Sequence, residues 1–228
     1  MLQQEIELKY RIPTETDFNR LLQSLGTPRC QEEQINFFFD TVDFRLKNKG
    51  LCLRLRQSNE VFFLTCKAPV QGLQSPNQQV SMHDEWEVSI DPPLAQSLLS
   101  GSPSCLEMMR STDRDWSPIL AQTRLCLLAR LEKQLENRSI QQIGSFSNLR
   151  THFSYEYEGH SLDFELDQTR FSEKQIDREL EIEIPALISL SGFQAHVEEF
   201  LRSLSIPIET STGKSERFFA LLRAEALI

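Results

Sequence analysis

The sequence predicts a mainly β fold of the α+β class, in which antiparallel strands are joined by turns and by a few helices. Charged and apolar side chains alternate with a two-residue period in several segments, as they do in half-buried strands. Turn-rich stretches such as 48–50 separate these segments, and leucines recur at helical spacing elsewhere. The 228 residues are compatible with one domain, 1–228, because closed β-barrels reach this size as single units.

The expected elements follow from these periods in chain order. Alternation predicts strands over 5–12, 37–39, 51–56, 61–67, 85–90, 141–146, 149–158, 161–167 and 178–184. Helical spacing predicts helices over 14–26, 118–137, 193–204 and 212–226. The segment 92–117 is rich in Ser, Pro and Asp, which indicates a possible helix followed by a loop or small insertion.

Composition excludes several classes of partner. The net charge of −9 argues against a broad basic surface for nucleic acid or anionic lipid, although a local basic cavity is compatible with it. Neither a signal-peptide run nor a membrane-spanning run is found, so we expect no membrane partner. Five cysteines without a C-x-x-C pair exclude a zinc site readable from the sequence and favour a reducing cytoplasm. The oligomeric state stays open.

Five expected strands carry charged side chains on one face. These side chains are Glu5, Glu7 and Lys9; Arg54 and Arg56; Glu85 and Glu87; Asp163, Glu165 and Asp167; Glu179, Glu181 and Glu183. For any one strand the simpler interpretation is a solvated outer face. The sorting by sign favours another, in which carboxylate pairs hold hard cations and Arg and Lys bind phosphate oxygens in a shared interior. Periodicity does not distinguish inward from outward.

A series of motifs in a fixed order resembles one known family. The series is Glu5-Ile6-Glu7-Leu8-Lys9; Phe38-Phe39-Asp40-Thr41-Val42-Asp43 with Leu46, Gly50 and Leu53-Arg54-Leu55-Arg56; Leu64-Thr65-Cys66-Lys67; Glu85-Trp86-Glu87; Asn148-Leu149-Arg150; Glu165-Leu166-Asp167-Gln168-Thr169; Glu179-Leu180-Glu181-Ile182-Glu183; and Lys214. Together these motifs resemble the CYTH superfamily, also called triphosphate tunnel metalloenzymes. The resemblance spans nearly the whole chain and implies an eight-stranded antiparallel β-barrel tunnel with helices packed outside.

The resemblance also implies roles for individual residues. It implies Mg²⁺ or Mn²⁺ as cofactor, with Glu5, Glu7, Glu181 and Glu183 as the main metal-binding carboxylates and Glu85, Glu87 and Asp167 as further acidic groups. It implies that Lys9, Arg54, Arg56, Lys67 and Arg150 bind the phosphates, and that Lys214 joins Glu5 and Glu7 in catalysis. His83 stands where the family often has a basic residue that binds phosphate, so the resemblance does not decide whether His83 makes this contact.

The activity implied is metal-dependent hydrolysis of the terminal phosphoanhydride of a small triphosphate, with inorganic tripolyphosphate as the first candidate. We hypothesise that one metal bridges phosphate oxygens and that a second delivers the attacking water. Thiamine triphosphatase and class IV adenylate cyclase activities remain alternatives on the same fold. A non-catalytic module that binds polyphosphate or nucleotides is the alternative from another class.

Several local features receive simpler interpretations. Gly213-Lys214-Ser215 resembles the end of a P-loop, but the earlier glycine position is Ile208, so a Walker motif is not supported. We expect Asp40 and Asp43 to shape a turn rather than to bind metal. We expect His152 and His160 to be surface groups, because no second His lies at metal-binding spacing.

Overall fold

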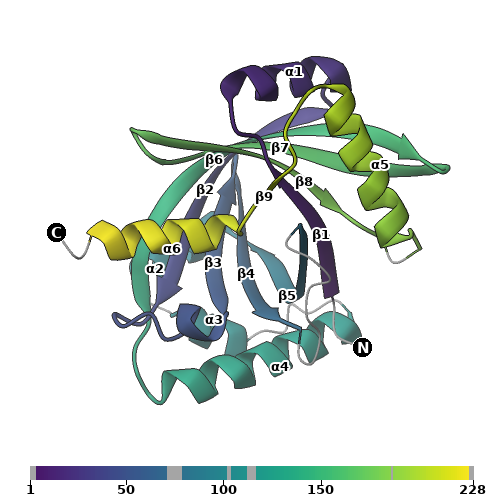
Figure 1. The fold of residues 1–228 in the computed structure, drawn as a ribbon. Helices are drawn as coiled ribbons and strands as arrows, with labels where there is room; N and C mark the ends of the chain where they lie inside the picture. Colours follow the sequence, from purple (N-terminus) through teal and green to yellow (C-terminus); the bar gives the residue numbers. More distant parts are fainter. Residues whose placement is uncertain (1–3, 71–78, 102–103, 112–116, 186, 226–228) are drawn as a thin grey trace.

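The structure is a computed structural model that describes residues 4–70, 79–101, 104–111, 117–185 and 187–225 (Figure 1). Its strands are β1 (Gln4–Arg11), β2 (Cys30–Asp40), β3 (Cys52–Ser58), β4 (Val61–Pro69), β5 (Val80–Ile90), β6 (Gln141–Tyr157), β7 (His160–Ser172), β8 (Gln175–Glu183) and β9 (Glu209–Thr210). Its α-helices are α1 (Glu15–Leu25), α2 (Pro92–Leu99), α3 (Cys105–Arg110), α4 (Pro118–Leu135), α5 (Leu190–Ser203) and α6 (Lys214–Glu225).

The strands form a closed antiparallel barrel. They are hydrogen-bonded in the order β5-β4-β3-β2-β6-β7-β8-β1, and β1 pairs again with β5, which closes eight strands into a ring. The two-residue strand β9 adds to the end of β1 at Tyr10 and Arg11. The expected eight-stranded antiparallel barrel with helices outside is therefore confirmed.

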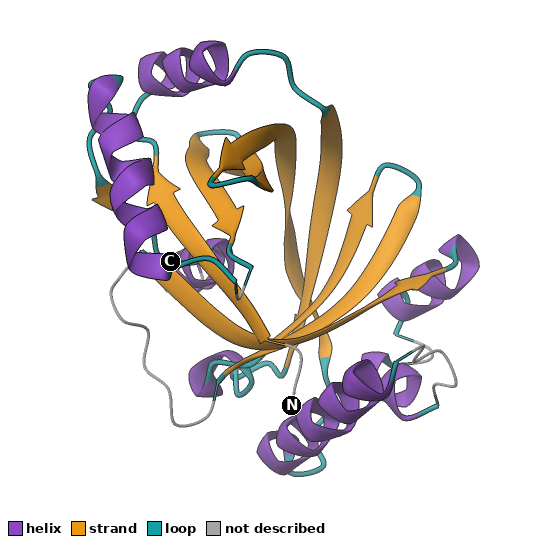
Figure 2. Ribbon diagram, turned by 90° about the vertical axis from the view of Figure 1, so that its right-hand side faces the viewer, coloured by secondary structure: helices purple, strands orange, loops and turns teal. Residues whose placement is uncertain are grey.

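Figure 2 shows the helices lying outside the barrel. The apolar faces of the strands point outward and are buried against these helices. One core lies between the outer faces of β3, β4 and β5 and the helices α2, α3 and α4, with Trp86 fully buried at 0% exposure. A second core packs β1, β7 and β8 against α1 and α5 around Phe164 and Phe193. Because alternate side chains of a strand point to opposite faces, burying the apolar faces outside directs the charged faces into the barrel.

The C-terminal helix α6 packs against inward-facing side chains rather than outward-facing ones. Phe218 and Phe219 of α6 contact Phe38 of β2 and Phe146 of β6 in a cluster of aromatic rings. Gly144, where β6 departs from regular register with β2, makes room for this helix, since a Cβ there would lie 2.8 Å from the Phe218 ring. Helix α6 thus lies over one end of the barrel and carries Lys214 to its interior.

The boundaries of helix α1 agree with those predicted from its capping residues. Helix α1 is capped by Thr14, whose hydroxyl oxygen accepts from the Asp17 backbone N–H, and it stops at Gly26 with φ of 81°. In 92–117 the structure has the expected helix α2 and a second helix, α3, that was not expected. Its signal was present, because Ser104 and Glu107 form a capping box. Residues 102–103 and 112–116 lie outside the described part of the chain.

The expected break between two strands at 146–149 is wrong, because β6 runs unbroken through it. Ser147 and Asn148, which lie between the two expected strands, both pair with β2 and with β7. The buried Asn148 side chain donates to Asp167 and accepts from Thr169, so its polar groups are satisfied inside the sheet. Strand β2 likewise begins at Cys30, seven residues before the predicted start, because its polar residues Gln34 and Asn36 face the interior. In the described ranges no helix is long and apolar enough to cross a membrane.

The turn after β2 depends on one buried carboxylate. Asp40 is fully buried, and its oxygens accept from the backbone N–H groups of Thr41, Leu46 and Lys47 at 2.7 to 2.9 Å. Asp43, by contrast, is exposed and pairs with Arg45 and Arg138. The turn-shaping role expected for Asp40 accords with these three hydrogen bonds.

We predict that Asp40→Ala lowers the free energy of unfolding by about 3 kcal/mol or more, because it leaves buried backbone donors without acceptors at about 1–3 kcal/mol each. Asp43→Ala is the matched control and should cost less than about 1 kcal/mol, as exposed ion pairs do. Urea unfolding followed by circular dichroism measures both. Equal losses for the two variants would contradict the role given to Asp40.

Candidate active site

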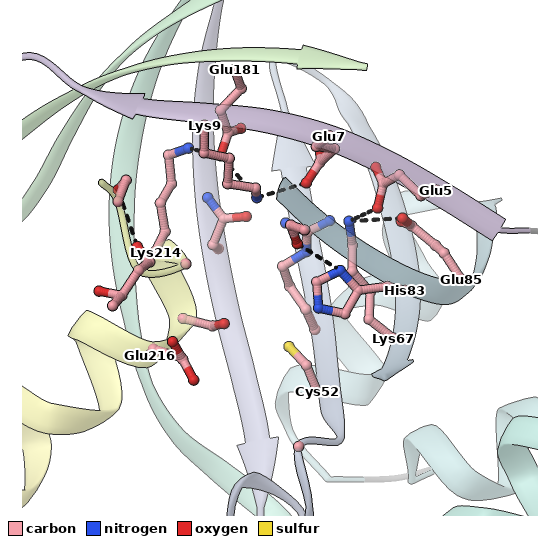
Figure 3. Close-up of a pocket in the computed structure, with 18 of the residues that line it drawn as sticks. Glu5, Glu7, Lys9, Cys52, Lys67, His83, Glu85, Glu181, Lys214 and Glu216 are labelled. Atoms are coloured by element: carbon pink, nitrogen blue, oxygen red, sulfur yellow. Dashed lines mark hydrogen bonds and ion pairs between the residues drawn. The ribbon is translucent and has the colours of Figure 1, made fainter. Parts of the chain in front are cut away.

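The barrel encloses a cavity of about 1070 Å³, lined by residues of all eight barrel strands and of α6 (Figure 3). Twelve of the thirteen residues assigned by resemblance line it: Glu5, Glu7, Lys9, Arg54, Arg56, Lys67, Glu85, Glu87, Arg150, Glu181, Glu183 and Lys214. The thirteenth, Asp167, is fully buried behind two of them. In the described residues, seven lysines and arginines line the cavity of a protein whose net charge is −9, so the basic groups are concentrated here.

Carboxylates crowd together at the N-terminal half of β1. Glu7 lies directly opposite Glu183 in the β1–β8 register, and Glu5 is two residues away on the same face. Burial, followed by repulsion from Glu5 and Glu7, raises the pKa of Glu183 above its ordinary value. Like charges directly opposite each other destabilise a sheet unless a cation lies near them. This end of the cavity therefore has an excess of negative charge.

Two lysines partly compensate these carboxylates. The Lys67 ammonium contacts Glu5 and lies 2.7 Å from Glu85, while Lys9 lies 2.6 Å from Glu7 and 3.1 Å from Glu181. Figure 3 shows Lys67 close to both Glu5 and Glu85, and Lys9 close to Glu7. The lysines hold the carboxylates apart from one another and remain charged.

Two arginines from β3 form the next part of the wall. Arg54 and Arg56 occupy alternate positions of one strand, and both approach Glu87, at 3.6 and 2.9 Å. Burial, followed by repulsion from Arg54, holds the pKa of Arg56 below its ordinary value. Among the described residues, the Nε atoms of Arg54 and Arg56 are buried and have no hydrogen-bond partner. Buried donors of this kind normally find an acceptor, so this wall is suited to an anion.

Lys214 joins a network at the end of the barrel covered by α6. Its ammonium lies 2.7 Å from Asp167, 3.0 Å from Glu179 and 2.7 Å from Glu181. Burial disfavours the ammonium, but these three carboxylates outweigh it and raise the pKa of Lys214. Lys214 is therefore a fixed cation at neutral pH and not a proton acceptor.

Asp167 orients Arg150 as well as Lys214. Its two oxygens accept from Nε and an NH2 group of Arg150 at 2.8 and 2.6 Å, which is a bidentate pair. Asn148 donates a further hydrogen bond to the same carboxylate at 2.8 Å. Because it already binds two cations, Asp167 is placed to position Arg150 and Lys214 rather than to face the cavity.

Sequence reasoning assigned no role to three charged residues that complete this network. Glu179 is buried and pairs with Lys214 and, at 2.7 Å, with Arg217. Arg217 also lies 2.8 Å from Asp177. Glu165 contacts Arg150 and lines the cavity. Strand parity already placed Glu165 and Glu179 on the charged faces, whereas the contact between Arg217 and β8 depends on how α6 docks.

His83 lies on the cavity wall, where the resemblance left a phosphate contact open. Burial, assisted by the nearby Lys67 and Lys9, lowers the pKa of His83 to about 4. Its Nδ1 is 3.0 Å from the hydroxyl of Ser81. At neutral pH it is therefore an uncharged hydrogen-bonding group and adds no positive charge to the site.

The expectation that His152 is a surface group is wrong. His152 is 7% exposed, because it points into the barrel from β6 between β2 and β7. It lies beside Asp163 at 2.8 Å and within 4.8 Å of potential metal ligands, whereas His160 is exposed at the β6–β7 hairpin. Histidine spacing along the chain could not show this, since the neighbours of His152 come from other strands.

The donor set of the cavity fits a hard divalent cation. Glu5, Glu7 and Glu183 offer carboxylate oxygens, which Mg²⁺ and Mn²⁺ prefer, and their mutual repulsion would be relieved by a cation. In the structure Glu5 and Glu7 turn toward Lys67 and Lys9. A metal ion that binds here must therefore replace Lys67 and Lys9 as the partner of these two carboxylates.

The fold and this interior define a class of protein, a closed barrel with a charged tunnel. The chain belongs to the family described as the CYTH domain, whose model matches residues 3–219. It is 29% identical over 221 residues to "Putative triphosphatase YjbK" of Bacillus subtilis, and the match covers 96% of each chain.

Solved structures share the fold. HpAC1 from Hippeastrum, for which a dominant triphosphatase activity is described, is 24% identical with a TM-score of 0.74, covering 97% of this chain and 96% of that one. A Bacillus halodurans protein described as a putative adenylate cyclase is 22% identical with a TM-score of 0.62, covering 95% and 98%. Both likenesses concern the fold alone.

We predict that Glu165 makes the protein less stable as the pH rises. Burial and the neighbouring carboxylates raise the pKa of Glu165 from 4.5 to about 8. Between these values the unfolded chain has released the proton that the folded chain retains, so stability falls with rising pH. Glu165→Gln should remove this loss, which exceeds about 1 kcal/mol because one pKa unit corresponds to about 1.4 kcal/mol.

Urea unfolding of both proteins at about pH 5 and about pH 8.5 measures the difference. If the difference in unfolding free energy between the wild type and Glu165→Gln is the same at both pH values, Glu165 is ionised at both and the prediction is wrong.

Proposed function

We propose that this protein hydrolyses the terminal phosphoanhydride of a small triphosphate, with inorganic tripolyphosphate as the first candidate. The observation that carries the proposal is the crowding of like charges in two adjoining parts of one closed cavity. Arg54 raises the cost of charging Arg56, while Glu5 and Glu7 raise the cost of charging Glu183. A polyphosphate anion relieves the first repulsion and a divalent cation relieves the second, so the two ligands favour each other's binding.

The cationic wall supplies the contacts for the phosphate chain. Arg54 and Arg56 have unused buried N–H donors, and Arg150 is held in a fixed orientation by Asp167. Guanidinium groups bind phosphate oxygens with two parallel hydrogen bonds. Lys67, on the neighbouring strand β4, and Lys9, on β1, bind as point charges. We therefore assign Lys9, Arg54, Arg56, Lys67 and Arg150 to substrate binding, and Asp167 to positioning.

Glu5, Glu7, Glu181 and Glu183 would hold Mg²⁺ or Mn²⁺, with Glu85 and Glu87 as neighbouring acidic groups. Such a cation, when bound, screens the charge of the phosphates and lowers the pKa of a bound water. The chain itself contributes the fixed orientation of these carboxylates, because each projects inward from a hydrogen-bonded strand.

The chemistry requires neutralisation and alignment more than covalent participation by the protein. An oxygen–phosphorus bond forms from water to the terminal phosphorus, and the anhydride bond breaks to release diphosphate and orthophosphate. Lys214 and Arg150 are permanently charged and lie next to each other through Asp167, so they are placed to stabilise negative charge that develops on the leaving oxygen. Lys214 would be the catalytic cation, with Glu5 and Glu7 at the metal.

The alternatives predict different products. A class IV adenylate cyclase would convert ATP to a cyclic nucleotide and pyrophosphate, a thiamine triphosphatase would prefer the thiamine ester, and a binding module would release nothing. The name of YjbK supports hydrolysis over cyclisation. We further propose that residues 1–228 act as one domain in the cytoplasm, without nucleic acid or membrane partners; the five free cysteines suit a reducing compartment.

We expect orthophosphate release from tripolyphosphate with Mg²⁺ or Mn²⁺ and none in the presence of a chelator, because the carboxylate-rich end needs a cation to admit more negative charge. Parallel assays with ATP and thiamine triphosphate identify the substrate by kcat/KM. Cyclic nucleotide from ATP would favour a cyclase, and tight anion binding without release from any substrate would favour the binding module.

We expect Glu7→Gln and Glu181→Gln to lower kcat at least about a hundredfold, the scale on which removal of one key charged group acts. Glu33→Gln is the matched control, because Glu33 is exposed on the outer face of β2. Circular dichroism and thermal unfolding establish that the barrel is intact. A near-normal rate for either variant at saturating metal would remove that glutamate from the site.

A further inference from the structure

A second cluster of metal-ligand side chains lies between β2 and β6, and none of its members is among the residues that line the tunnel cavity. Potential ligand atoms of Cys30, Glu32 and His152 all lie within 4.8 Å of one another. Cys30 and His152 are directly opposite in the β2–β6 register, and Glu32 is two residues along the same face of β2. Two paired strands thus fix the backbone positions of all three.

His152 points into this cluster with a nitrogen that has no hydrogen-bond partner. Among the described residues, its Nε2 is buried and unpartnered, and the side chain is only 10% exposed. Glu32 Oε1 lies 3.6 Å from Nε2, which is longer than a hydrogen bond. A buried ring nitrogen normally has a bonding partner, so the orientation of Nε2 indicates a site where a ligand such as a metal ion binds.

The other ring nitrogen is fixed by a carboxylate. His152 Nδ1 lies 2.8 Å from Asp163 Oδ2, and Arg29 holds that same oxygen at 2.6 Å. Because an ionised carboxylate can only accept, Nδ1 donates to Asp163, and in the neutral ring the lone pair is then on Nε2, the nitrogen that binds a metal. A carboxylate behind a histidine in this way is the usual arrangement around metal-bound histidines.

The carboxylate of Glu32 is held in a similar manner. Its Oε2 accepts from the Ser58 hydroxyl at 2.8 Å and from the Gln34 amide at 3.1 Å. These two hydrogen bonds leave Oε1 as the oxygen that faces His152. The orientations of both ligands are therefore set by neighbours that are not ligands themselves.

We infer that Cys30, Glu32 and His152 form a binding site for one Zn²⁺ ion, separate from the tunnel carboxylates. Sulfur, nitrogen and oxygen donors suit Zn²⁺, whereas Mg²⁺ prefers oxygen alone. The Cys30 thiol releases its proton to solvent as the ion binds, and the resulting thiolate and the Glu32 carboxylate neutralise the charge of the ion. Three protein ligands leave a fourth position for water on the side of the exposed Cys30.

Titration of the reduced full-length protein with Zn²⁺ and Co²⁺, in excess Mg²⁺ to saturate carboxylate sites, tests this site. We expect one equivalent of Zn²⁺ by calorimetry and a thiolate-to-cobalt charge-transfer absorption with Co²⁺. Cys30→Ser should abolish the absorption and weaken Zn²⁺ binding at least tenfold, as should His152→Gln. Asp163→Asn should weaken binding about 10- to 100-fold, the usual effect of removing such a partner.

Cys126→Ser is the matched control, because Cys126 lies on α4, and it should bind both metals as the wild type does. Glu7→Gln should also retain the absorption, since it alters only the tunnel. Because Cys30 is exposed, Cys30→Ser should fold normally. This variant therefore tests the site even if His152→Gln does not fold. Unchanged Zn²⁺ affinity in Cys30→Ser, or Co²⁺ binding without a thiolate band, would overturn the site.

Discussion

The structure depends on one constraint, that charges enclosed in a barrel have to be neutralised by other charges. An unpaired carboxylate or ammonium in a protein interior costs several kcal/mol, and its partner must be close and well oriented. The strands meet this requirement by alternating acidic and basic neighbours around the wall. Lys67 lies between Glu5 and Glu85, and Arg150 lies against Asp167 and Glu181.

The same compensation prepares the interior for its ligands. Each cation on the wall is held by carboxylates, so it stays charged in spite of burial, as the raised pKa of Lys214 shows. Where compensation is incomplete, at Arg56 and at Glu183, the repulsion marks places where an anion or a cation lowers the free energy. Binding of a polyphosphate with its metal would then exchange one set of ion pairs for another, with little reorganisation of the backbone.

Helix α6 completes this interior from outside the sheet. The aromatic contacts of Phe218 and Phe219 with Phe38 fix the helix over the barrel end. The first residue of the helix, Lys214, is thereby brought to Asp167 and Glu181, and Arg217 to Glu179. The apolar contacts in the middle of the helix therefore determine the electrostatics of its first turn.

The sequence by itself determined the charged faces, because strand alternation assigns each side chain to one of two faces whatever the neighbours are. It predicted Glu5, Glu7 and Lys9 on one face and Arg54 and Arg56 on another, and the motif order indicated the barrel. It could not show that the faces point inward, since that depends on which helices cover the apolar side. Nor could it show Arg217 at Glu179 or Cys30 beside His152, because contacts between residues 38 and 122 positions apart are set by register and docking, which local periodicity does not encode.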